Sequence, residues 1–85
     1  MKINFHKNFE KQYKKLKVNE QKKAQERLSI FLKNPFNPLL NNHPLKGKYL
    51  DYRSINITGD LRAIFKKSSK EIIFVAIGSH SNLYG

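Results

Sequence analysis

A chain of 85 residues is long enough for one small domain and is close to the size at which a single hydrophobic core becomes marginal. It has no cysteine, which excludes disulfide bonds and thiolate metal ligands, and no apolar run approaches the roughly 20 residues that a membrane-spanning helix needs. Seventeen Lys and Arg residues against six Asp and Glu residues give a formal charge of +11. We therefore expect one soluble, cytoplasmic domain over residues 1–85 that binds a polyanion, and nucleic acid is the obvious candidate.

The excess of positive charge also has less specific interpretations. Twelve of the basic residues lie in residues 1–48 and five lie in residues 49–85, so the first half of the chain is the more basic half. A solubilising lysine surface or an acidic protein partner would account for the same charge. Binding to nucleic-acid phosphate is the interpretation that predicts a strong dependence on salt.

Two amphipathic helices are predicted after a short strand over residues 2–5. The apolar residues of the first helix, over about residues 7–17, recur at helical spacing and are Phe5, Phe9, Tyr13 and Leu16. A second helix would begin after Asn19, a good N-cap residue, and end before Pro35. Its apolar stripe consists of Ala24, Leu28, Phe31 and Leu32. Both stripes are predicted to form core, and their lysines are predicted to face solvent.

Three strands are predicted in the second half of the chain. Residues 34–48 contain three prolines and four asparagines and are predicted to be a loop. The strands that follow, separated by two polar turns, are residues 52–58, 61–67 and 72–77. The element order β-α-α-β-β-β predicts an α+β fold in which two helices pack on one face of a small, mostly antiparallel twisted sheet. The other face of the sheet would then be open to solvent or to a ligand.

The three histidines are the candidate acid–base groups, because imidazole titrates close to neutral pH. No two of them have the spacing of a zinc motif, so we expect no metal site. His6 is predicted to be incidental, whereas His43 lies in the loop before the sheet and His80 follows the last strand. Asp60 and Arg62 have the same parity, so Arg62 could bind a phosphate while Asp60 orients an imidazole. On spacing alone, a surface ion pair and two solvated histidines remain an alternative interpretation.

Two motifs at the expected separation resemble those of a known family. They are the run HPLKGKYLDYRSINITGDLRAIFK at residues 43–66 and the terminal IGSHSNLYG at residues 77–85. Together they resemble the RelE/ParE superfamily of bacterial toxins of type II toxin–antitoxin systems. The similarity is to the YafQ-like branch, in which a His-Pro-Leu-x-Gly loop, a Tyr-Arg strand, a strand that opens with Asp and a terminal Gly-Ser/Thr-His-x-x-Leu-Phe/Tyr-Gly occur in this order. The resemblance covers nearly the whole chain and implies a RelE-like fold.

The activity that the resemblance implies is ribosome-dependent cleavage of mRNA without a metal or another cofactor. In such toxins the RNA 2′-hydroxyl attacks the adjacent phosphate, and the 5′-oxygen leaves as it is protonated. By motif position, the catalytic candidates are His43, Asp60, His80 and Tyr84, and the resemblance adds Arg62, which stands where many relatives of the wider superfamily carry an arginine. His80 would be the leading general acid and His43 a base or phosphate contact, with Asp60 as an orienting or proton-accepting carboxylate. Arg62 would stabilise charge on the phosphate, and Tyr84 would stack on a base or position the phosphate.

Four further residues are predicted to bind RNA, namely Lys46, Lys48, Arg53 and Asn56. The first three are cations suited to the RNA backbone. Asn56 stands where the YafQ-like pattern usually has a histidine, so the site has one titratable group fewer than the pattern provides. The terminal segment that carries Tyr84 and Gly85 is expected to be mobile.

The resemblance also implies partners: a cognate acidic antitoxin that folds on binding, the ribosome with mRNA in its A site, and operator DNA only through the antitoxin complex. Two other functions stay open. A ParE-like toxin would inhibit DNA gyrase without catalysis, although such a binding protein does not need the pair His43 and His80. A degenerate toxin would act only within its antitoxin complex, and Asn56 is the residue that keeps this alternative open.

Overall fold

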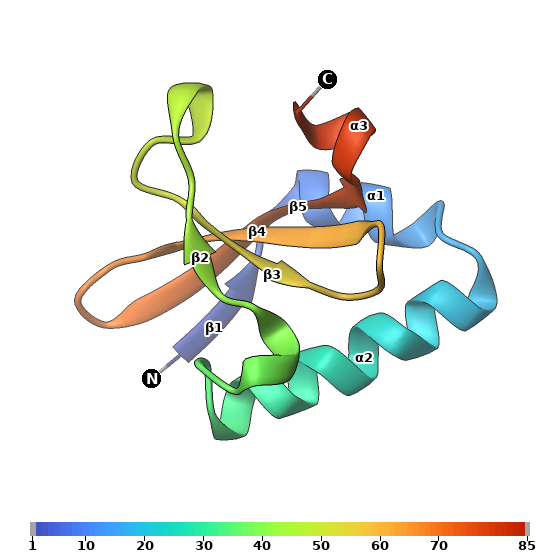
Figure 1. Ribbon diagram of the computed structural model, residues 1–85, viewed down its shortest axis with the longest axis horizontal. Coiled ribbons are helices and arrows are strands. Elements are labelled where there is room, and N and C mark those ends of the chain that lie inside the picture. Colours follow the sequence, from blue (N-terminus) through green and yellow to red (C-terminus); the bar gives the residue numbers. More distant parts are fainter. Residues whose placement is uncertain (1, 85) are drawn as a thin grey trace.

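A five-stranded mixed sheet organises residues 2–84, the part of the chain that the computed structural model describes. In chain order the elements are β1 (Lys2–Phe5), α1 (Lys7–Lys14), α2 (Val18–Lys33), the 3₁₀ turn η1 (Pro38–Leu40), β2 (His43–Pro44), the 3₁₀ turn η2 (Gly47–Tyr49), β3 (Arg53–Asn56), β4 (Leu61–Lys67), β5 (Glu71–Ser79) and α3 (His80–Tyr84). The strand order is β1-β5-β4-β3-β2, with β1 parallel to β5 and the other neighbours antiparallel. The predicted α+β fold with a mostly antiparallel sheet is confirmed (Figure 1).

Helix α1 begins at a histidine that the sequence left without a role. His6 is the N-cap residue, and its Nδ1 accepts a hydrogen bond from the main-chain N–H of Asn8 at 3.0 Å. The helix ends at Lys14, three residues before the predicted end at residue 17. Phe9 is 3% exposed, as the apolar stripe predicted, and anchors α1 to the sheet.

Two details of the prediction for helix α2 are wrong. Asn19 is not the cap: the helix begins at Val18, and the main-chain N–H of Lys17 donates to the Glu20 carboxylate at 3.0 Å. A carboxylate in the first turn of a helix also interacts well with the helix dipole. Leu32 was predicted to lie in the core but is 66% exposed, because it lies about 100° around the helix from its buried neighbour Phe31.

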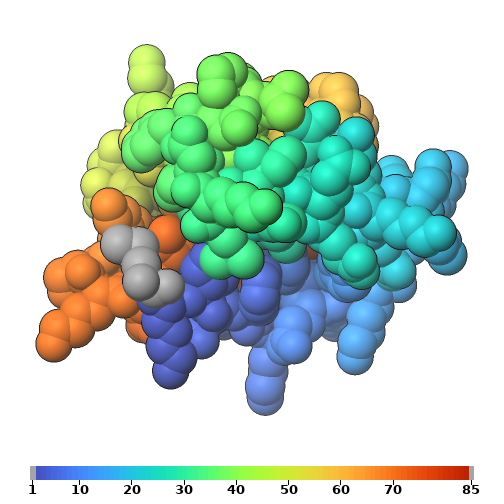
Figure 2. Space-filling model, turned by 90° about the horizontal axis from the view of Figure 1, so that it is seen from below, coloured from blue at the N-terminus to red at the C-terminus, as the bar shows by residue number. Residues whose placement is uncertain are grey.

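The main core lies between the sheet and the helices α1 and α2. Figure 2 shows this side of the molecule, where α2 and the segment after it cover the sheet and α1 lies beside α2. At the centre of the core the rings of Phe31, Phe65 and Phe74 contact one another, with centroid separations of 5.1, 5.3 and 5.2 Å. Aromatic contacts of this kind add about 0.5–1.5 kcal/mol each beyond the burial of their area. These contacts fix β4 and β5 against α2.

Residues 34–48 are not the uninterrupted loop that was predicted. They contain η1, β2 and part of η2. Strand β2 pairs antiparallel with β3, with His43 opposite Ser54 and Pro44 opposite Arg53. The described part of the chain therefore forms five strands instead of the predicted four. Proline has no main-chain N–H to donate, and an edge strand such as β2 tolerates this. Because proline is uncommon in strands, the presence of Pro44 led to the prediction of a loop where β2 is found.

The end of the chain contains more regular secondary structure than predicted. Strand β5 runs over Glu71–Ser79, beyond the predicted residues 72–77, and leads directly into α3. Residues 80–84 form α3, and Leu83 of this helix is 3% exposed; the expected mobility of the terminal segment stays a prediction. Gly85, the last residue of the terminal motif, lies outside the described residues. Within residues 2–84, no helix is both long enough and apolar enough to cross a bilayer.

The second face of the sheet is partly covered, not fully open as predicted. Ile64, Ala76 and Leu83 form a small buried cluster there, so α3 lies on the opposite side of the sheet from α2 (Figure 1). The half-buried residues that pack around this cluster are Leu45, Tyr49, Tyr52, Val75 and Tyr84. The register of β4 and β5 shifts between Ile64 and Phe65, which leaves Val75 as an extra residue in β5. This bulge explains why Phe74 and Ile77 both reach the main core while Ala76 faces the other side.

Candidate active site

Strand pairing brings together side chains from three strands on the face opposite α1 and α2. His43 pairs with Ser54, and Asn56 pairs with Arg62. Paired residues point to the same side of a sheet, and so do residues two apart along one strand. These four side chains therefore share one face with Ile64, whose side chain belongs to the small cluster under α3.

Helix α3 brings two further predicted residues to this face. It follows β5 without a loop, and its first main-chain N–H, from His80, donates to the carbonyl of Asp60 at 3.1 Å. This bond ties the start of α3 to the turn before β4. His80 and Tyr84 lie about one helical turn apart, and their ring centroids are 4.6 Å from each other. The buried Leu83 holds the helix down between them.

These elements enclose a hollow of about 190 Å³. The residues that line it are His43, Leu45, Lys46, Arg62, His80 and Tyr84. Five of them were predicted as site residues from the sequence, and they come from β2, the segment after it, β4 and α3. Two imidazoles and two cations thus share one small concave surface, which is an arrangement that can move protons on a bound anion.

Arg62 is held in place by the backbone of its own turn. Its Nη1 donates to the carbonyl of Thr58 at 2.8 Å and to the carbonyl of Leu61 at 3.2 Å. Arginine has five N–H donors in a rigid fork, so these bonds leave donors for an anion. A guanidinium fixed in this way is suited to bind phosphate oxygens with little further loss of side-chain freedom.

The contact made by His43 determines which of its ring nitrogens carries a proton. Its Nδ1 lies 2.7 Å from the carbonyl oxygen of Asn41. A carbonyl can only accept a hydrogen bond, so Nδ1 is the donor, and the neutral ring then has its lone pair on Nε2. Asn41 adopts a left-handed conformation at φ 46°, which asparagine tolerates better than most residues. The neutral His43 side chain is therefore prepared to accept a proton at Nε2.

Asp60 does not make the contact that its parity predicted. It precedes β4, which begins at Leu61, and its side chain is exposed. Its carboxylate forms no hydrogen bond or ion pair with any residue from 2 to 84, and only its main-chain carbonyl reaches His80. Asp60 is therefore linked to the hollow only through its main-chain carbonyl, which holds the start of α3 in place.

The other predicted RNA-binding residues lie outside the hollow. Arg53 is opposite Phe65, on the side of the main core, where its Nε donates to Asn42 Oδ1 at 2.7 Å and its guanidinium lies 5.5 Å from the Phe36 ring centroid. Lys48 Nζ lies 5.3 Å from the centroid of the Tyr49 ring, near the hollow. The side-chain oxygen of Asn56 is buried and has no hydrogen-bond partner in the described part of the chain.

Sequence reasoning missed Leu45 and Tyr49. Leu45 lines the hollow, and the ring of Tyr49 meets the ring of Tyr84 edge to face with centroids 5.9 Å apart. The signal was present in the residues KYLDYR, where two tyrosines follow closely on the histidine loop. A contact between residues so far apart in the chain depends on the docking of α3, which local patterns do not indicate.

The positive charge of the protein is almost uncompensated by ion pairs. Among residues 2–84 the one salt bridge joins the exposed pair Lys23 and Glu26 at 3.5 Å. Lys46 and Arg62 therefore add to a field that attracts anions toward the hollow. The same described residues contain no group of three or more His, Asp or Glu side chains placed to hold a metal ion.

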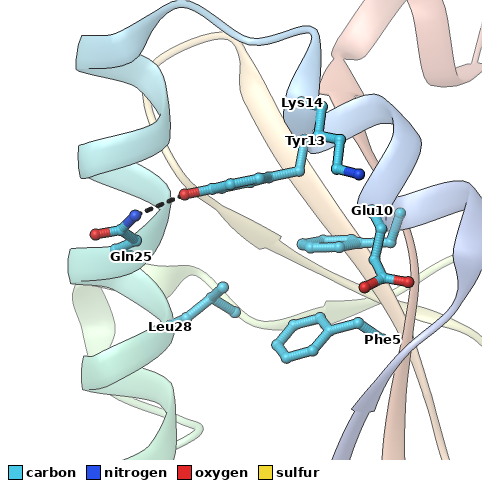
Figure 3. Close-up of a pocket in the computed structure, with 7 residues that line it drawn as sticks. Phe5, Glu10, Tyr13, Lys14, Gln25 and Leu28 are labelled. Carbon is cyan, nitrogen blue, oxygen red and sulfur yellow. Dashed lines mark hydrogen bonds between the residues drawn. The ribbon is translucent and has the colours of Figure 1, made fainter.

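A second hollow, of about 320 Å³, lies on the far side of the molecule between α1, α2 and β1 (Figure 3). Its wall is mainly apolar, with Phe5, Tyr13 and Leu28 pointing into it. Gln25 donates to the Tyr13 hydroxyl at 2.7 Å across one side. This hollow contains no histidine or arginine, so it lacks the acid–base groups that the smaller one brings together.

Comparisons with known proteins agree with this geometry. The family model described as a bacterial toxin of a type II toxin-antitoxin system, YafQ, matches residues 1–85. YafQ from E. coli strain BL21(DE3) superposes with a TM-score of 0.84 at 23% identity, covering 98% of this chain and 97% of that one. A copper-bound mutant toxin from Helicobacter pylori is 31% identical with a TM-score of 0.78 and 99% coverage of both chains. The E. coli DinJ-YafQ complex matches at 26% identity, with a TM-score of 0.73 and coverage of 98% and 97%. No curated protein sequence matches the chain.

Proposed function

The chain belongs to the YafQ family of bacterial toxins of type II toxin–antitoxin systems, and we propose that it cleaves mRNA on the ribosome by acid–base chemistry. The observation that carries this proposal is the hollow in which His43, His80 and Arg62 meet. A protein that inhibits its target by binding alone does not need two imidazoles and a fixed guanidinium in one small site. The basic surface supports a nucleic-acid substrate.

The proposed reaction is an in-line displacement at one phosphate of the mRNA. The 2′-oxygen forms a bond to phosphorus as its proton passes to a general base. The bond from phosphorus to the 5′-oxygen of the next nucleotide breaks, and a general acid protonates that oxygen. The products are a 2′,3′-cyclic phosphate and a 5′-hydroxyl, so no water is consumed in this step.

The hydrogen bond from His43 to Asn41 supports the choice of His43 as the general base, because Nε2 of the neutral ring is the free proton acceptor. His80 is then the general acid and must be protonated before the reaction. Arg62 stabilises the charge that develops on the phosphate oxygens. General acid–base groups of this kind typically contribute about 10²–10⁴-fold each to the rate.

The remaining predicted residues have supporting roles in the proposal. Tyr84 stacks on a base or positions the phosphate, and Lys46 binds the RNA backbone from the edge of the hollow. Lys48 extends this contact. Asp60 positions His80 through its main-chain carbonyl, which replaces the carboxylate–imidazole contact expected from sequence.

Asn56 and Arg53 have the weakest support as RNA ligands. Asn56 shares the sheet face of the hollow but not its lining, and it can offer an amide but no proton shuttle. Arg53 is engaged with Asn42 on the other side of the sheet. We propose that Arg53 contacts RNA outside the cleavage site.

The proposed partners follow from the family. The E. coli relative forms a complex with DinJ, and we propose that this toxin likewise binds a cognate acidic antitoxin in the cytoplasm and reaches operator DNA only through it. We also propose that the ribosome holds mRNA in its A site in the geometry needed for in-line attack. A site with few preorganised groups depends on such help to position the nucleophile.

Primer extension on mRNA in a translating extract tests the proposal. Wild-type protein should cut within codons, and His80→Ala should reduce these cuts by about 10²–10⁴-fold. Lys33→Gln is the control, since this exposed residue of α2 lies on the opposite side of the sheet from the hollow. If the mRNA stays intact at a high dose of wild-type protein, the proposed nuclease activity is excluded. A gyrase supercoiling assay would then test the ParE-like alternative.

A further inference from the structure

A larger hollow lies next to the proposed cleavage site on the same face of the sheet. Its volume is about 410 Å³, and the residues that line it are His6, Asn8, Tyr49, Tyr52, Val75 and Ala76. Tyr49 belongs to this hollow and Tyr84 to the smaller one, and their rings touch. The two hollows are therefore neighbours on either side of this pair of rings.

The rings form a continuous row across both hollows. The centroids of Tyr52 and Tyr49 are 5.9 Å apart, those of Tyr49 and Tyr84 are also 5.9 Å apart, and those of Tyr84 and His80 are 4.6 Å apart. Tyr49 and Tyr52 are half-buried, with one side packed on the cluster under α3 and another side on the larger hollow.

Ammonium groups lie over the two tyrosines of the larger hollow. Lys66 Nζ is 5.5 Å from the centroid of Tyr52, and Lys48 Nζ is 5.3 Å from the centroid of Tyr49. Neither lysine forms an ion pair within residues 2–84. A covering for the small cluster needs only apolar groups, and leucines would serve as well. Rings with phenol groups, paired with unneutralised cations, are instead the combination that binds single-stranded nucleic acid.

We propose that Tyr49, Tyr52, Lys48 and Lys66 form a second nucleotide subsite. Its rings stack on the base of a nucleotide that flanks the cleaved bond, and its lysines bind the adjoining phosphate. This inference rests on the proposed function, because it assigns a place to RNA that extends beyond the cleavage site. Stacking on a ring accepts any base, so this subsite contributes affinity and position more than sequence preference.

The test measures binding of short single-stranded RNA at low salt by fluorescence anisotropy. The probes are an oligoadenylate and a strand of the same length that lacks every base, so that both carry the same phosphate charge. Tyr49→Leu and Tyr52→Leu should weaken binding of oligoadenylate by about 5- to 150-fold, the usual range for one stacked base. Binding of the strand without bases should change little. Tyr49→Phe and Tyr52→Phe keep the rings and should bind as the wild type does.

Two matched controls separate this subsite from general effects on structure or charge. Phe36 is an exposed ring with a cation nearby, but it lies beside Arg53 on the other side of the sheet, so Phe36→Leu should not affect binding. Lys66 and Lys67 are neighbours in β4, but Lys67 pairs with Ile72 of the main core and so faces away from the tyrosines. Lys66→Gln should therefore weaken binding of both strands more than Lys67→Gln does.

Three results would overturn the subsite: equal loss of binding to both strands in the leucine variants, no loss at all, or no binding of RNA by the wild type. Thermal unfolding of each variant shows whether it is folded. If a leucine variant is unfolded, the comparison of Lys66→Gln with Lys67→Gln still decides, and equal binding by these two variants would overturn the subsite. Binding does not require cleavage, so the two proposals can fail separately. If His80→Ala leaves the mRNA cuts intact, the proposed chemistry fails while the subsite can still stand.

Discussion

The two faces of the sheet differ in what their side chains do. On the side of α1 and α2, twelve buried apolar residues among residues 2–84 form the main core, and the rings of Phe31, Phe65 and Phe74 contact one another at its centre. On the side of α3, three buried residues of the described chain form a small cluster. The side chains that lie around it are His43, His80, Arg62, Tyr49, Tyr52 and Tyr84. Because the main core and the proposed cleavage site are on opposite faces, substitutions on one face should affect stability and those on the other face should affect activity.

The largest effect is expected at the centre of the main core. Phe74→Ala removes a side chain that is fully buried and contacts both Phe31 and Phe65. Truncation of a buried Phe typically costs about 3–5 kcal/mol, a large part of the stability of a small domain. Urea unfolding should show this loss. A decrease below about 1 kcal/mol would contradict the assignment of stability to this face.

The next effect should appear in activity alone. His43→Gln removes the proposed general base from the other face, so cleavage should fall by about 10²–10⁴-fold. The free energy of unfolding should change by no more than about 0.5 kcal/mol, as for most substitutions away from a core. Primer extension and urea unfolding on the same preparation measure both quantities. Loss of stability in step with activity would show that the faces are not independent.

Leu83→Ala tests the one large apolar side chain by which α3 is buried on the sheet. A buried Leu→Ala change costs about 2–5 kcal/mol, but this is an upper limit here because α3 can detach locally while the sheet stays folded. Amide exchange should quicken in residues 80–84 and stay slow in β4 and β5. Cleavage should fall because His80 and Tyr84 lose their fixed positions. If α3 is detached and cleavage is unchanged, His80 and Tyr84 are not part of the cleavage site.

The smallest effect concerns Arg53, which the motif assigned to RNA but which the fold places on the core side. Arg53→Gln removes the hydrogen bond to Asn42 Oδ1 and should cost about 1–2 kcal/mol of stability. Binding of RNA should change less than it does in Lys46→Gln at the hollow. If Arg53→Gln loses more RNA binding than Lys46→Gln does, Arg53 is an RNA-binding residue, as the sequence motif predicted.

Local patterns predicted the regular elements well and their ends less well. The apolar spacing in α1 and α2 and the alternation in β3 and β4 depend on each segment having one buried side, so they are visible in the sequence. The Asn19 cap and the burial of Leu32 were wrong because each depended on where α2 begins and which of its sides faces the sheet. Strand β2 was missed because its pairing with β3 overrides the usual effect of Pro44.

The sequence by itself determined the α+β class, the basic character of the protein and the identity of the chemical groups, since composition, periodicity and the two motifs contain this information. Only the tertiary structure decided which of those groups meet. The pairing of β2 with β3 and the docking of Leu83 bring His43 and His80 to one hollow, while the start of β4 leaves the Asp60 carboxylate outside it. These outcomes depend on the free energy of contacts between segments that are far apart in the chain. Local sequence patterns contain no information about such contacts.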